Sequence, residues 1–430
     1  MSAASFKAIF FRFMLKLSMF YNTNIDVRYI DIVCFRLLFT NCADLYTNLS
    51  VLYMKFKNIR NYQILAAMIL SNPFLVTGYY NPDYFCDREK ETASMTNALY
   101  SGRNLTLIAP RRMGKTGLIK NVFYKLKEKQ PDIVTIYMDI YPTQNLGDFT
   151  TLFVTTVLNE VDNNVSFRPV FTIDPLTGSP RVSVEIAKST EEASLREVFD
   201  YMGASDKRYY IAIDEFQQIA SYPEKGVEAL LRSYIQFLPN VNFIFSGSKQ
   251  HVIQDMFLSA KRPFYQSTQI LSIDRIDRGE YYKFASDFFK RKKNLALEED
   301  VFSNIYDTFE GHTWYIQAIL NRLFSYPGKP DKNLVTHVVD EIIEESVYSY
   351  EILLAAYSSG NIRLIKAIAK EGRVKEINSG EFISKYDLKA ASSVNTSLKK
   401  IIDKELVCRS STGYMVYDRF MAIWLSRQPY

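Results

Sequence analysis

The residues Leu105-Thr106-Leu107-Ile108-Ala109-Pro110-Arg111-Arg112-Met113-Gly114-Lys115-Thr116 decide the fold of this chain. Their first four side chains are apolar and predict a buried strand, and from Gly117 to Phe123 apolar side chains recur at helical spacing. A strand, a tight loop ending in Gly-Lys-Thr and a helix are the arrangement that cradles the phosphates of a nucleotide. The sequence therefore predicts a P-loop, against the alternative of a surface loop with a solvated lysine.

Each part of this loop has an expected task. Its backbone N–H groups point at the β-phosphate, and the start of the helix adds the positive end of its dipole. Lys115 would neutralise the β- and γ-oxygens, and the Thr116 hydroxyl would take one position around Mg²⁺. Ala109 replaces the usual first glycine, which is tolerable if its φ is negative. The expected nucleotide contacts here are Pro110, Arg111, Arg112, Met113, Gly114, Lys115, Thr116 and Gly117.

A second part of the site is predicted about a hundred residues downstream. Tyr209–Ile213 is apolar, aromatic and β-branched, as in a strand buried on both faces, and it ends in Asp214 and Glu215. Open α/β sheets bind ligands at the carboxyl ends of their strands. We expect Asp214 to hold the Mg²⁺ ion through its water shell and Glu215 to act as the general base that polarises the attacking water. The alternative is a pair of helix-capping residues.

A third strand, Val241–Phe245, ends in Ser246, Gly247 and Ser248. In an ATPase, a polar residue at this place senses the γ-phosphate, so Ser246 or Ser248 could bond the water or the phosphate. Ser-Gly-Ser is also ordinary turn chemistry, and that alternative stays open. The three segments together predict ATP hydrolysis, or at least switching gated by ATP, with ATP and Mg²⁺ as the cofactors.

Composition limits the other classes of protein. The chain has 430 residues, 47% hydrophobic and 23% charged, which predicts two or three globular domains. No apolar run approaches the roughly 18 residues of a membrane span, so none is expected. The four cysteines are scattered without metal spacing, which predicts a reducing, cytoplasmic location, and the three histidines leave no room for a histidine-based zinc site.

Residues 1–67 differ from the rest of the chain. They carry eight Lys or Arg and three Asp or Glu, a net charge of +5, which equals the formal net charge of the whole sequence. A basic membrane-surface helix near Phe6–Tyr21 is one interpretation, although its charges do not share one face. We expect instead an atypical extension outside the working fold, with Met68 near the natural start.

The order of elements predicts an α/β fold with a three-layered parallel sheet. Strands and helices alternate up to Ile273, with an inserted hairpin over residues 162–190. The segment 277–345 reads as helices. Helices at 362–370, 384–391 and 395–404, then strands at 406–409 and 414–417, predict a winged helix-turn-helix. The expected domains are a P-loop ATPase domain at 68–273, a helical lid at 274–345 and the winged helix at 346–430.

Six motifs also carry a family resemblance: Phe85-Cys86-Asp87-Arg88-Glu89, Pro110–Thr116, Ile211–Gln217, Phe245–Ser248, Arg262-Pro263-Phe264-Tyr265 and Gly311-His312-Thr313-Trp314-Tyr315. This set resembles the archaeal-type AAA-like ATPases of the STAND class, in a bacterial-looking version. The resemblance covers about residues 73–425. It implies an ATP/ADP switch with Mg²⁺ and slow hydrolysis, in a signalling, defence or mobile-element context.

The resemblance also implies roles for single residues. Lys115 and Thr116 correspond to the phosphate and metal contacts, Asp214 and Glu215 to the Walker B pair, and Arg88 to the adenine side. Arg111 and Arg112 flank the phosphates, and Arg262 is a candidate arginine finger, within the chain or across subunits of a homo-oligomer. For these three arginines, ion pairing with nearby carboxylates is the alternative. His312 and Trp314 mark the lid and are expected to serve packing.

The winged helix leaves its partner open. On double-stranded DNA, its third helix would face the groove with Ser392, Ser393, Asn395, Thr396, Lys399 and Lys400, and Arg409 would touch phosphate. Residues 361–430 carry thirteen Lys or Arg and seven Asp or Glu, which suits DNA but also a protein partner. The predicted function is therefore Mg²⁺-dependent ATP hydrolysis that drives a conformational switch. The alternative is a DNA-binding or scaffolding module. Bound nucleotide would stabilise this module, which would hydrolyse the nucleotide only negligibly.

Overall fold

The computed structural model describes residues 71–161, 167–173, 180–186, 195–410 and 412–429. The extension expected at residues 1–67 lies outside these residues. From Asn72 onward the chain forms one compact unit. Within the described ranges, no helix combines the length and the apolar run needed to cross a membrane.

A five-stranded parallel sheet forms the centre of the first half of this unit. Its order is β2-β5-β6-β1-β7, and every neighbouring pair is parallel. The carboxyl ends of all five strands therefore meet at one edge, with Asp139 in register with Asp214. The strands are β1 (Leu105–Ile108), β2 (Val134–Asp139), β5 (Tyr209–Asp214), β6 (Val241–Gly247) and β7 (Gln269–Ser272).

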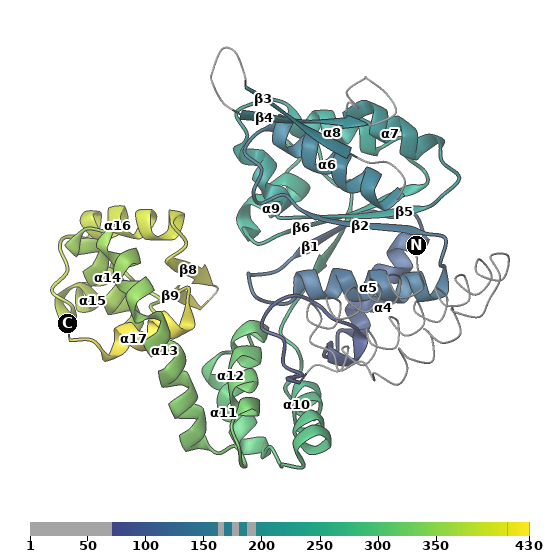
Figure 1. Ribbon diagram of the computed structural model, residues 1–430. Helices are drawn as coiled ribbons and strands as arrows, with labels where there is room; N and C mark the ends of the chain where they lie inside the picture. Colours follow the sequence, from purple (N-terminus) through teal and green to yellow (C-terminus); the bar gives the residue numbers. More distant parts are fainter. Residues whose placement is uncertain (1–70, 162–166, 174–179, 187–194, 411, 430) are drawn as a thin grey trace, which may run out of the picture. The chain divides into compact units, whose positions relative to one another are not determined.

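Helices cover both faces of this sheet (Figure 1). On one face lie α4 (Glu89–Tyr100) and α5 (Lys115–Lys129), whose apolar sides share a core with β1. On the other face lie α6 (Leu146–Val161), α7 (Leu195–Ala204), α8 (Val227–Ile235) and α9 (Gln250–Leu258). Two short 3₁₀ helices, η1 (Pro82–Tyr84) and η2 (Phe216–Ser221), complete this part. The predicted three-layered α/β fold is confirmed.

The inserted hairpin is present as β3 (Phe167–Ile173) and β4 (Pro180–Ile186), which pair antiparallel from Phe167 opposite Ile186 to Ile173 opposite Pro180. Its turn, residues 174–179, lies outside the described residues.

A group of helices follows the sheet: α10 (Arg278–Lys293), α11 (Glu299–Thr308), α12 (Thr313–Ser325) and α13 (Lys332–Ala355). Glu310 and Gly311 take positive φ values of 52° and 70°, so the chain reverses direction before α12. The segment before α4 packs on this group. Phe74 is buried among aromatic rings of α10 and α12, and the Asn72 and Asn321 side chains each bond a backbone carbonyl of the other segment.

The last part contains α14 (Ser359–Glu371), α15 (Gly380–Lys385), α16 (Ala391–Asp403), the hairpin of β8 (Val407–Ser410) and β9 (Gly413–Val416), and α17 (Arg419–Arg427). The helix predicted at 384–391 is wrong in position. Ser379 caps the N-terminus of α15 by accepting from the Phe382 N–H, and the chain turns left-handed at Asp387, with φ of 42°. Helix α17, capped by Asp418, was not predicted.

The aromatic core between the sheet and helices α6 to α9 allows a prediction about stability. Phe245 of β6 is fully buried, and its ring centroid lies 4.4 Å from that of Phe216 and 5.3 Å from that of Phe257. Phe245→Ala should lower the free energy of unfolding by about 3–5 kcal/mol, because it leaves a cavity. Phe237→Ala, at a ring that is 76% exposed, should change it by no more than about 0.5 kcal/mol. Urea unfolding compares the two, and equal losses would contradict this account.

Candidate functional site

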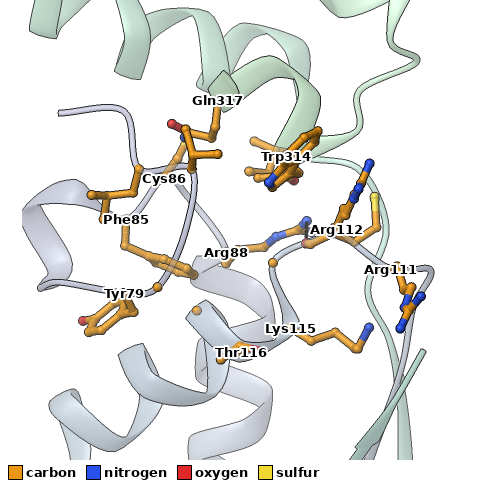
Figure 2. Close-up of a pocket in the computed structure, with 18 of the residues that line it drawn as sticks. Tyr79, Phe85, Cys86, Arg88, Arg111, Arg112, Lys115, Thr116, Trp314 and Gln317 are labelled. Atoms are coloured by element: carbon orange, nitrogen blue, oxygen red, sulfur yellow. Dashed lines mark hydrogen bonds between the residues drawn. The ribbon is translucent and has the colours of Figure 1, made fainter. Parts of the chain in front are cut away.

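One pocket lies where three segments meet: the chain before α4, the P-loop, and the start of α12. Figure 2 shows Tyr79, Phe85, Cys86 and Gln317 gathered at one end of it and Arg111, Arg112 and Lys115 at the other. The carboxylates Asp214 and Glu215 also line it. The pocket therefore has a charged end, on the loop and the strand edge, and a mainly apolar end, on the segment before α4.

The backbone of the P-loop prepares an anion site. Arg112 and Gly114 adopt positive φ values of 67° and 86°, which curl the loop ahead of α5. Gly114 caps α5 without a side-chain hydrogen bond, so the first N–H groups of that helix keep their donors for an anion. Ala109 is not among the described residues of positive φ, which meets the condition set for alanine at this position.

Lys115 is buried at the charged end. Its ammonium donates to the carbonyls of Ala109 and Pro110, at 3.3 Å each, so the side chain folds along the loop. Burial lowers the pKa of Lys115, while the charges of Asp214 and Glu215 act in the opposite direction. The lysine and the two carboxylates therefore share one electrostatic environment.

The buried carboxylate of Asp214 joins several elements. Its Oδ2 accepts from the Thr116 hydroxyl at 2.8 Å and from the Tyr137 hydroxyl at 2.7 Å. Its Oδ1 accepts from the Glu215 amide at 3.0 Å and from the Ser246 hydroxyl. Ser246 thus contacts Asp214 but is not among the described residues that line the pocket.

Glu215 is held by a separate set of donors. Its Oε2 accepts from the Ser248 hydroxyl at 2.7 Å and from the Gln217 amide at 2.5 Å. The backbone of Glu215 is left-handed, with φ of 56°. This conformation is unfavourable for a glutamate, so the surrounding contacts have to hold it in place. A side chain at Gly247 would collide with Gln217 Oε1, so this glycine leaves room for the residue that holds Glu215.

The oxygen atoms at this edge are of the kind that Mg²⁺ binds. Burial raises the pKa of Asp139, and the charges of Asp214 and Glu215 add to the rise. Within the described ranges, no three His, Cys, Asp or Glu residues could hold a metal ion by themselves. Mg²⁺ keeps several waters and takes one or two protein oxygens, so the Thr116 hydroxyl and the Asp214 carboxylate would suffice.

The arginines fall into different places. Arg112 donates to the Tyr315 hydroxyl at 3.0 Å and to Asp418 at 3.1 Å, and it stacks on Trp314, 4.1 Å from the ring centroid. Arg111 pairs with Glu405 at 3.0 Å. Both arginines line the pocket, and both reach carboxylates of the last part of the chain.

Arg88 and Arg262 complete this set. Arg88 is buried in the pocket wall, pairs with Glu91 at 2.8 Å and donates to the Met113 carbonyl at 3.3 Å. Arg262 pairs with Glu228 and Asp255, at 3.1 Å each. Arg262 is not among the described residues that line the pocket. Its contacts are ion pairs with nearby carboxylates, the alternative to an arginine finger.

Sequence reasoning missed two groups. The first is Tyr137, which donates to Asp214. Strand β2 pairs in parallel with β5 and ends beside Asp214, so this pairing was the signal that could have placed Tyr137 at the site. The second is the apolar end with Gln317, formed by segments more than two hundred residues apart. Gly117, which the sequence predicted as a nucleotide contact, packs against this apolar end. A Cβ atom on it would lie 3.2 Å from the Phe85 ring, so the glycine lets that ring pack on α5.

The fold and this arrangement are those of the P-loop nucleotide-binding proteins. It belongs to the family described as the ATPase domain predominantly from Archaea, whose model matches residues 85–319, more than half of the chain. Residues 348–427 match the model of a probable winged helix domain. Among curated protein sequences, none matches this chain.

Solved structures show the same fold. The Walker-type ATPase PABY2304 of Pyrococcus abyssi aligns with a TM-score of 0.59 and 17% identity, over 82% of this chain and 99% of that one. The ORC2 protein of Aeropyrum pernix, solved as ADPNP and ADP complexes, aligns with a TM-score of 0.51 and 15% identity, over 79% and 92%. At these identities the likeness concerns the fold.

His312, which precedes α12, gives the fold a pH-dependent stability. Burial lowers the pKa of His312 to about 4 from its ordinary 6.5, and nearby arginines, Arg419 and Arg275 first, add to the effect. As the pH falls below about 6.5, the unfolded chain takes up a proton that the folded chain refuses, so this residue destabilises the fold increasingly down to about pH 4.

His312→Gln should remove that contribution. Relative to the unaltered protein, the variant's melting temperature should rise steadily as the pH falls from about 6.5 to about 4. The matched control is His251→Gln, at an exposed histidine, which should follow the unaltered protein. Thermal unfolding across this range measures the difference, and a constant offset for His312→Gln would contradict the assignment.

Proposed function

We propose that this protein hydrolyses ATP with Mg²⁺ and uses the nucleotide state to switch the contact between its ATPase half and its winged helix. The observation that carries the proposal is the 2.8 Å bond between Thr116 and Asp214, beside the buried Lys115. The nucleotide complexes of the ORC2 structure support ATP or ADP as the ligand. A bound Mg²⁺ ion would supply charge neutralisation at the β- and γ-phosphates.

In this proposal each residue has one task. Lys115 leaves the loop carbonyls and binds phosphate oxygens, and the free N–H groups at the start of α5 bind the others. Thr116 and Asp214 hold the metal. Glu215 orients the attacking water and takes its proton on Oε1, because Ser248 and Gln217 both donate to Oε2 and hold the carboxylate in place.

The switch rests on the two P-loop arginines. Arg111 and Arg112 line the phosphate end, yet their guanidinium groups pair with Glu405 and Asp418 of the winged helix part. A triphosphate offers these arginines a stronger anion than a partly solvated carboxylate. Nucleotide binding and winged helix docking therefore compete for the same cations, and hydrolysis restores the carboxylate contacts.

Arg262 is proposed as an arginine finger that acts on the nucleotide of a second copy. Its guanidinium is engaged by Glu228 and Asp255 and does not line the pocket of its own chain, as far as the described residues show. This role requires a homo-oligomer. We also propose the domain limits 68–273, 274–345 and 346–430, and we retain the STAND class, its signalling, defence or mobile-element context and the cytoplasmic location as proposals.

The alternative function, a nucleotide-stabilised DNA-binding module, has one observation in its favour. The polar side chains of α16 expected to face DNA, Ser392, Ser393, Asn395, Thr396, Lys399 and Lys400, are all exposed. Under this alternative, double-stranded DNA should bind with a strong salt dependence while phosphate release stays at the background level. A weak, salt-independent association would favour a protein partner.

Phosphate release tests the enzymatic proposal. Lys115→Ala should abolish release of phosphate from Mg²⁺-ATP, and Glu215→Gln should lower kcat by about 10²–10⁴-fold while ATP still binds. Lys127→Ala, at an exposed lysine of the same helix, is the matched control and should keep full activity. Equal phosphate release from the unaltered protein and from Lys115→Ala would refute the proposal.

Charge-removing variants test the switch. Asp418→Asn keeps the acceptor that caps α17 but removes the charge facing Arg112. It should raise the hydrogen-exchange rate of α17 in the nucleotide-free protein by about 2- to 5-fold, the effect of losing a partly exposed ion pair. The control is Asp387→Asn, whose pair with Arg363 lies within the winged helix and is exposed. If both variants leave α17 unchanged, the arginine contacts do not hold the winged helix.

A further inference from the structure

Two polar atoms on the part of the pocket wall that α12 forms have no partner among the described residues. Gln317 Oε1 and Thr313 Oγ1 are shielded from solvent and make no hydrogen bond to any described residue. Both side chains line the pocket, and they stand four residues apart on the same face of α12. Leaving a buried acceptor unsatisfied is costly, so two such atoms on one pocket wall point to a ligand that satisfies them.

Tyr281 lies beside both of these residues, and its hydroxyl donates to the Thr313 carbonyl at 3.3 Å. Burial raises the pKa of Tyr281, and Gln317 acts in the opposite direction, as a donating NH₂ group does. An amino group that faces Tyr281 leaves the Gln317 carbonyl oxygen as the acceptor available to a ligand.

This acceptor lies where a nucleobase would. Phosphates belong at the Lys115 end, so the base of the same nucleotide extends to the opposite end, beside Phe85, Cys86 and Gln317 (Figure 2). Because the two polar atoms are shielded from bulk water, a base reaches them by parting the side chains around them. It then gains a hydrogen bond that water did not already make.

We propose that Gln317 selects nucleotides by the exocyclic group at position 6 of the purine, accepting a hydrogen bond from the 6-amino group of adenine. Guanine and hypoxanthine carry a carbonyl oxygen at that position, which would face Gln317 Oε1 as acceptor against acceptor. The Thr313 hydroxyl can donate or accept, so it adds affinity to either ring without choosing between them. This inference rests on the proposed nucleotide binding and adds the residue that reads the base.

Titration calorimetry with ADP, IDP and GDP tests the proposal, since diphosphates are not consumed. The unaltered protein should bind ADP about 10- to 100-fold more tightly than IDP or GDP, the effect of one buried hydrogen bond. Gln317→Leu should bring the ADP-to-IDP ratio below about 3-fold, chiefly by weakening ADP. The matched variant Thr313→Val should weaken both nucleotides and keep the ratio.

Each outcome separates the inference from the proposed function. If the unaltered protein binds ADP, IDP and GDP equally, base selection by Gln317 is overturned while nucleotide binding stands, and this comparison needs no variant to fold. The inference is also overturned if Gln317→Leu, with unchanged circular dichroism, keeps the full preference for ADP. If none of the three nucleotides binds more tightly than it does to Lys115→Ala, the proposed function itself fails.

Discussion

The position of the buried Asp214 carboxylate constrains the rest of the site. A carboxylate removed from water needs several donors, and here they come from α5, β2 and β6 and from the backbone of Glu215. Those elements are adjacent only because the strands are parallel and end at one edge. The hydrogen bonds to Asp214 therefore join these elements at the sheet edge, where Thr116, Lys115 and Glu215 line one pocket.

Arg112 connects that edge to the remainder of the chain. Its backbone is left-handed, its carbonyl accepts from the Trp314 N–H at 3.1 Å, and its guanidinium lies between Trp314, Tyr315 and Asp418. Burial opposes the charge of this guanidinium, but Tyr315 and Asp418 outweigh it, so the pKa of Arg112 is raised. A P-loop residue in a strained conformation is thus held by α12 and by the cap of α17, which makes the loop sensitive to both.

The sequence was sufficient for the parts whose signal is local. Buried apolar runs predicted the strands, and the parallel fold then required the residues that follow them to meet, as Thr116 and Asp214 do. The position of α15 depends on the Ser379 cap, a single side-chain contact that periodicity does not carry. The apolar end of the pocket joins Phe85 to Gln317, and the second contacts of Arg111 and Arg112 reach Glu405 and Asp418. Such pairings arise from tertiary packing, which spacing along one chain does not encode.

In the proposed nucleotide complex, one end of the pocket would supply affinity and the other would supply specificity. All nucleoside diphosphates carry the same phosphates, so Lys115 and the N–H groups of α5 can bind them but cannot distinguish them. Under the proposed binding mode, discrimination would come from the opposite end, where Gln317 lies (Figure 2). The same helix carries Trp314 and Tyr315, which contact Arg112, and the Tyr315 hydroxyl accepts from the Arg419 N–H at the start of α17. Because a helix moves largely as a rigid body, a bound base that shifts α12 would also shift its contacts with the P-loop and the winged helix. In the proposed function, the helix that reads the base is therefore also placed to transmit its presence.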